Sequence, residues 1–109
     1  MSVDPHRVAE ARSLAAHRLI AQRLEEDPRI LAEARQRVAD WLRDAAVAAP
    51  YAERWHALLS GPQHELIATM TDPGEEATAL RQCTPFAGAI DPRERWRLWE
   101  AVRQSLESQ

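Results

Sequence analysis

The sequence predicts an all-α protein, folded as a compact bundle of about five to six helices. Asp-Pro pairs occur four times in the 109 residues, apolar residues recur at helical spacing, and no segment shows the two-residue alternation of a strand. Aspartate is a good N-cap because its carboxylate accepts hydrogen bonds from the first exposed amides, and proline suits the following position. We therefore expect a helix after each of Asp4, Asp27, Asp72 and Asp91.

The first predicted helix runs from about Pro5 to Glu25 and carries two apolar seams. The seams are Val8, Ala11, Ala15 and Leu19 on one side, and Ala9, Ala16, Ile20 and Leu24 on the other. A helix that lies on a protein surface shows a single apolar stripe. Two seams indicate a central helix, or a helix whose second face meets another chain, as in a homo-oligomer.

The second predicted helix runs from about Pro28 to Ala46 and has one core-facing stripe. The stripe consists of Leu31, Ala34, Val38, Trp41, Leu42 and Ala45. Only Glu26 and Asp27 separate the first two helices, so we expect a long helical hairpin at the N-terminus. A sharp bend between the two helices is the alternative.

Shorter helices follow the predicted hairpin. One covers Tyr51 to Leu59 and ends at Ser60-Gly61-Pro62; the next covers Leu66 to about Thr71. Another follows Asp72, and the last runs from Pro92 to about Ser105. Glu75 and Glu94, three residues after their aspartates, match the capping-box spacing. The segment between the last two helices contains Pro85, Phe86 and Gly88 and is expected to form a structural loop that Phe86 anchors.

The composition is that of an ordinary globular protein, which we expect to form one domain over residues 1–109. It is 45% apolar and 28% charged, which argues against a disordered chain. All the basic residues are arginine, and the net charge of −3 lacks the basic excess of typical nucleic-acid binders. Cys83 is the only cysteine, and neither a membrane span nor a secretory signal is evident. These features predict a cytoplasmic location without membrane association.

Residues that could support catalysis or metal binding are scattered. The four histidines and Cys83 show no helical spacing of three or four residues between any two of them. We interpret the histidines as isolated surface residues and Cys83 as a small buried group. The capping aspartates account for several remaining acids. The sequence therefore predicts no enzyme activity, no metal and no cofactor.

Arginine and tryptophan remain as candidate binding residues. Core packing is the first explanation for the tryptophans, but two of them lie among arginines in the last helix, a composition typical of interface hot spots. In the first helix the arginines form two ladders, explained first as flanks that cover apolar surface, then as partners for carboxylates, and last as DNA contacts. The predicted partner-binding residues are Arg7, Arg12, Arg18, Arg23, Arg93, Arg95, Trp96, Arg97, Trp99 and Arg103.

Several short motifs resemble a group of short bacterial proteins regarded as antitoxins of two-gene toxin–antitoxin modules. The motifs are His17-Arg18-Leu19-Ile20-Ala21, Asp27-Pro28, Ala34-Arg35, Trp41-Leu42, Tyr51, Trp55, Leu58-Leu59, Leu80-Arg81-Gln82, Pro85-Phe86-Ala87-Gly88 and Arg95-Trp96. The resemblance spans most of the chain. It implies a cytoplasmic inhibitor that binds and neutralises a toxin enzyme.

We therefore expect a non-catalytic protein-binding module, an antitoxin-like inhibitor of a partner enzyme. A small DNA-binding transcriptional regulator is the first alternative, with nucleic acid the less favoured partner. An enzyme or small-ligand binder that uses Cys83 or a histidine is the second alternative.

Overall fold

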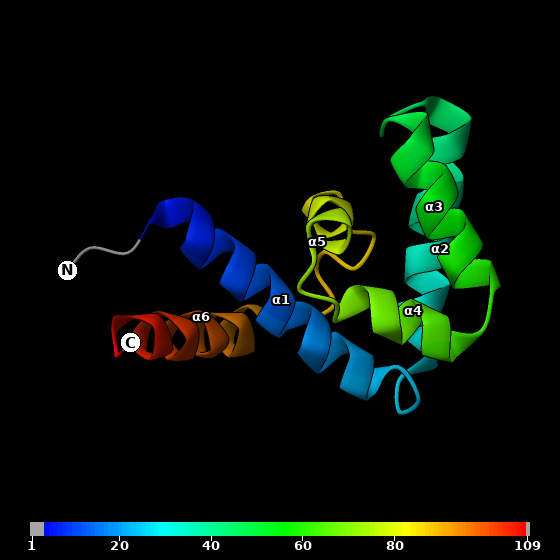
Figure 1. Cartoon of the computed structure of the whole chain (residues 1–109). Helices are drawn as coiled ribbons and strands as arrows, with labels where there is room; N and C mark the ends of the chain where they lie inside the picture. The colour runs from blue at the N-terminus through cyan, green and yellow to red at the C-terminus, as the bar shows by residue number, and fades with distance from the viewer. Residues whose placement is uncertain (1–3, 109) are drawn as a thin grey trace.

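The computed structural model describes residues 4–108, which contain six helices and no strand (Figure 1). The helices are α1 (Pro5–Arg23), α2 (Pro28–Asp44), α3 (Ala49–Ser60), α4 (Gln63–Met70), α5 (Glu75–Gln82) and α6 (Pro92–Glu107). The predicted all-α class is confirmed. No helix within the described range is both long and apolar enough to cross a lipid bilayer.

Three of the four Asp-Pro pairs start helices as predicted. The carboxylates of Asp4, Asp27 and Asp91 accept hydrogen bonds from the amides two residues later, at 3.0 to 3.1 Å. The predicted helix after Asp72 does form, but the prediction that Asp72 caps it was wrong. Its carboxylate accepts from the Gly74 amide at 2.8 Å, and α5 begins one residue later with Gly74 as its N-cap. A glycine directly after Asp-Pro favours such a side-chain-closed turn over an immediate helix.

The predicted N-terminal hairpin does not form. The chain bends sharply between α1 and α2, so that α2 packs along α3 while α1 packs along α6 and contacts α4 and α5 (Figure 1). Leu24 and Ile30 flank the bend and are both buried, so the bend directs both side chains into one core. The neighbours of α1 on several sides explain its two apolar seams, as expected for a central helix.

Trp55 lies at the centre of the core and has no exposed surface. Its indole nitrogen donates to the backbone carbonyl of Leu80 at 3.2 Å, and its ring meets Phe86 edge to face with ring centres 5.9 Å apart. Arg37 of α2 holds the loop around Phe86 by donating to two of its carbonyls, those of Pro85 at 2.9 Å and Ala87 at 2.8 Å. The loop before α6 is therefore fixed on two sides.

The last helix is peripheral to this core. None of the residues from Pro92 to Glu107 is fully buried, and α6 contacts the core through the half-buried Leu98 and Trp99. It lies beside α1, at the end of the molecule opposite α2 and α3 (Figure 1). One side of α6 thus packs on α1, while the other side faces away from the protein.

Candidate functional site

The predicted binding residues lie on α1 and α6, which run antiparallel to each other. Arg23 near the end of α1 forms an ion pair with Glu94 near the start of α6. The hydrogen bond between them raises the pKa of Arg23 and lowers the pKa of Glu94. Glu94 therefore joins two helices, in contrast to the capping box predicted for it.

Arg12 and Trp99 form a second contact between these helices. The guanidinium carbon of Arg12 lies 5.8 Å from the centre of the Trp99 ring, within the range of a cation–π interaction. The Arg12 Nε is buried and has no hydrogen-bond partner within residues 4–108. Arg12, Arg23 and Trp99 are thus engaged inside the protein, in the packing of α6 on α1.

The opposite side of α6 presents a cationic and aromatic surface, which we call the outer α6 face and define by Arg93, Trp96 and Arg97. Trp96 is 65% exposed, the highest exposure among the large apolar residues exposed in the described range. Arg93 and Arg97 are exposed, and within residues 4–108 neither guanidinium forms an ion pair or donates a hydrogen bond. Arg103 lies nearly two turns further along and is paired with Glu100 at 2.7 Å.

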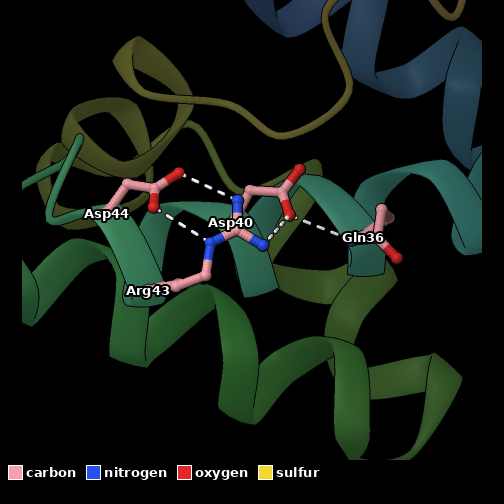
Figure 2. A network of polar contacts seen from close by, with 4 residues as sticks. All are labelled: Gln36, Asp40, Arg43 and Asp44. Atoms are coloured by element: carbon pink, nitrogen blue, oxygen red, sulfur yellow. Dashed lines mark hydrogen bonds and ion pairs between the residues drawn. The ribbon is translucent and has the colours of Figure 1, made fainter.

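The arginine at the end of α2 shows the contrasting arrangement (Figure 2). Arg43 lies between two carboxylates, 2.9 Å from Asp44 and 3.3 Å from Asp40, and Gln36 donates to Asp40 at 2.9 Å. The charge of Arg43 is therefore matched within its own helix. The two arginines of the outer α6 face form no such ion pair among the described residues, although the charge of Arg97 helps to lower the pKa of Glu94.

The other predicted binding residues are separated from this face. Arg7 and Arg18 are exposed on α1, and Arg95 is exposed on α6. Arg95 also lines a pocket of about 390 Å³ between α1, the loop before α6, and α6 itself. The full lining consists of Ala9, Arg12, Ser13, Ala16, His17, Ile20, Thr84, Phe86, Ala87, Gly88, Ile90, Arg95 and Trp99.

His17 lies in the wall of this pocket, so the prediction of a surface histidine was wrong for this residue. It is 3% exposed. Its Nδ1 donates to the carbonyl of Ser13 and the Thr84 hydroxyl donates to its Nε2, both at 2.7 Å. Two satisfied ring nitrogens allow a neutral histidine to be buried. The signal in the sequence was its place with Ser13, Ile20 and Leu24 on one helical stripe, a spacing typical of a core-facing position.

Burial lowers the pKa of His17; the nearby charge of Arg81 lowers it further, and the hydrogen bond to Ser13 opposes the shift. A histidine whose pKa is lower in the folded state contributes stability that is complete above its unfolded pKa of about 6.5 and is lost as the pH falls below it. As the pH falls from neutral to below about 6.5, the wild type should lose more free energy of unfolding than His17→Gln, because only the wild type has a buried histidine that is protonated on unfolding. Urea unfolding of both proteins across these pH values measures the difference.

The matched control for this prediction is His56→Gln, at an exposed histidine of α3. It should follow the wild-type pH dependence. Equal pH dependence for His17→Gln and the wild type would contradict the assignment of His17 as a neutral, buried group.

Arg81 is a second buried polar residue that the sequence analysis missed. It is 4% exposed and donates to the carbonyls of Met70 and Asp72 and to the hydroxyl of Thr78. Burial lowers the pKa of its guanidinium, and the Asp72 carboxylate opposes the shift. These bonds fasten α5 to the end of α4, which is a structural role.

Groups with catalytic or metal-binding potential remain dispersed. Within residues 4–108, no three histidine, cysteine or acidic side chains are grouped so that they could hold a metal ion. Cys83 is half-buried, and burial raises the pKa of its thiol. A raised pKa leaves little thiolate at neutral pH, and the thiolate is the reactive form.

Comparisons with protein-family models, with curated proteins and with solved structures found no match for this chain. The resemblance to antitoxins stays a prediction.

Proposed function

We propose that this protein is a protein-binding module that docks the outer α6 face onto an acidic surface of a partner protein. The observation that carries the proposal is the exposure of Trp96 between two arginines whose guanidinium groups form no ion pair or hydrogen bond within the described residues. Tryptophan and arginine are the residues most enriched in interface hot spots. Covering an exposed indole removes its apolar surface from water and so favours binding.

The charge of this face indicates the chemistry of the partner. The whole chain carries a net charge of −3, so the cationic character is local to the outer α6 face. A planar guanidinium pairs with a carboxylate through two parallel hydrogen bonds, and an indole fits an apolar pocket. The surface that fits best therefore has carboxylates around an apolar depression.

The resemblance to antitoxins suggests how the protein would act: it would inhibit a partner enzyme by covering the active site of that enzyme. A helix that projects from one side of a small domain can cover the active site of an enzyme without contributing a reacting group. The ion pair between Arg23 and Glu94 and the stacking of Arg12 on Trp99 hold α6 in place. Because α6 is already ordered, little conformational entropy is lost when it binds.

In a two-gene module the partner is the protein encoded by the adjacent gene. We expect Trp96→Ala to weaken the complex with that partner by about 30-fold or more, as for the loss of a hot-spot residue. Arg93→Gln with Arg97→Gln should reduce the association rate and its dependence on salt, because exposed charges steer the encounter. Co-expression with a tag on the partner, followed by surface-based binding kinetics of the purified proteins, measures both effects.

The controls lie on α3, remote from α6. Tyr51 is an aromatic residue that is 41% exposed, and Arg54 is an exposed arginine without an ion pair in the described part of the chain. Tyr51→Ala and Arg54→Gln should both bind like the wild type. The proposal fails if no complex forms, if the α6 variants bind as the wild type does, or if the chain instead retards its own promoter DNA with a steep salt dependence.

A further inference from the structure

The pocket between α1 and α6 has the size and the walls of a small-molecule site. Its volume of about 390 Å³ falls in the range of natural ligand pockets, roughly 300–1,000 Å³. The large apolar residues in its wall are Ile20, Ile90, Phe86 and Trp99. Such walls favour a ligand with an apolar body, because covering them removes apolar surface from water.

The neutral polar groups that line the pocket already bond to each other. His17 accepts from Thr84 and donates to Ser13, and the Thr84 oxygen in turn accepts from the Phe86 amide at 3.1 Å. These groups therefore need no ligand to complete their hydrogen bonds. They form a neutral part of the pocket lining.

The two arginines of the pocket, Arg12 and Arg95, lack a carboxylate partner among the described residues, although Arg12 also contacts the Trp99 ring. The Arg12 Nε is buried without a partner within residues 4–108, while Arg95 is exposed and makes no ion pair in the same range. No aspartate or glutamate is among the residues that line the pocket. Two guanidinium groups beside an apolar wall, with no acid between them, create a local preference for an anion.

We propose that this pocket binds a small monocarboxylate with an apolar body, an arylalkyl or medium-chain alkyl acid. The carboxylate would lie between Arg12 and Arg95, because a guanidinium fork matches its two oxygens. The apolar body would lie along Ile20, Phe86 and Trp99. A phosphate dianion fits less well, since removing two charges from water requires more donors than two guanidinium groups at an apolar wall supply.

This inference goes beyond the proposed function and is independent of it. The ligand residues face the gap between α1 and α6, while the outer α6 face lies on the other side of the helix. Trp96→Ala should therefore bind the carboxylate as the wild type does. Loss of partner binding and loss of ligand binding are thereby separated.

Calorimetric titration at neutral pH and low salt, with phenylbutyrate, phenylbutyramide and octanoate as probes, tests the proposal. The wild type should bind both carboxylates, and should bind phenylbutyrate about tenfold or more tightly than the uncharged amide, as expected for a charge-assisted hydrogen bond. Arg12→Gln and Arg95→Gln should each lose most of this preference. Arg54→Gln is the matched control and should retain it.

Thermal unfolding of each variant accompanies the titration. If Arg12→Gln disturbs the packing of α6, then Arg95→Gln decides, because the exposed side chain of Arg95 makes no ion pair or hydrogen bond within residues 4–108. The proposal is overturned if both carboxylates bind the wild type with Kd above about 1 mM. It is also overturned if acid and amide bind equally, or if folded Arg95→Gln keeps the wild-type preference.

Discussion

Trp55→Ala should lower the free energy of unfolding by about 3–5 kcal/mol, the usual cost of truncating a buried tryptophan. Trp55 has no exposed surface, packs edge to face on Phe86 and donates to the Leu80 carbonyl. Its removal leaves a cavity at the meeting point of α3, α5 and the loop before α6. Small domains are stable by roughly 5–15 kcal/mol, so this single change would remove a large share of the total.

Urea unfolding, followed by circular dichroism, measures this effect, and Trp96→Ala provides a matched control on the same residue type. Because Trp96 is 65% exposed, its removal should change stability by no more than about 0.5 kcal/mol. Trp55→Phe should fall between the two, because it keeps most of the packing and loses the indole hydrogen bond. A similar loss for Trp96→Ala and Trp55→Ala would contradict the packing described for both residues.

Arg81→Met should cost roughly 2–4 kcal/mol of stability, although methionine is similar in length and more apolar. The side chain of Arg81 donates to the Asp72 carbonyl at 2.6 Å, the Met70 carbonyl at 3.3 Å and the Thr78 hydroxyl at 3.1 Å. Methionine leaves these acceptors without their donor, and the bond to the Met70 carbonyl is buried from water. An unsatisfied buried acceptor is costly because it has given up its bond to water without replacement.

The same unfolding measurement on Arg54→Met is the control for Arg81, since Arg54 is exposed and has no ion pair in the described range. It should remain within about 0.5 kcal/mol of the wild type. If Arg81→Met were as stable as Arg54→Met, the three hydrogen bonds would not fasten α5 to α4 as the structure indicates.

The helices of this protein could be predicted from local chemistry. Aspartate caps with proline in the next position mark three helix starts, since capping depends only on neighbouring residues. At Asp72 the same dipeptide is followed by glycine, and a turn forms instead. The local rule was correct where the next residues favoured a helix, and failed where one of them favoured a turn.

The arrangement of the helices depended on long-range contacts and could not be predicted in the same way. The short link between the first two helices permits either a hairpin or a bend, and the burial of Leu24 and Ile30 in one core selects the bend. Similarly, His17 is buried because Thr84 lies beside it in space, 67 residues further along the chain. No local pattern in the sequence indicates that Thr84 would be there.

The candidate binding residues were found by composition, but their division into two faces needed the structure. The sequence analysis treated the arginines and tryptophans of α6 as one set of candidate binding residues. The structure separates Trp99, which packs on Arg12, from Trp96, which faces away from the protein. The ion pair between Arg23 and Glu94 likewise required α1 and α6 to be neighbours.

Titration of the labelled protein with its partner, followed by heteronuclear NMR of the four indole N–H signals, tests most directly whether the outer α6 face is the binding surface. The Trp96 signal should shift or broaden as the complex forms. The Trp55 signal should stay unchanged, because its N–H is buried and bonded to Leu80. A complex that forms while the Trp96 signal stays in its free position would contradict docking through α6.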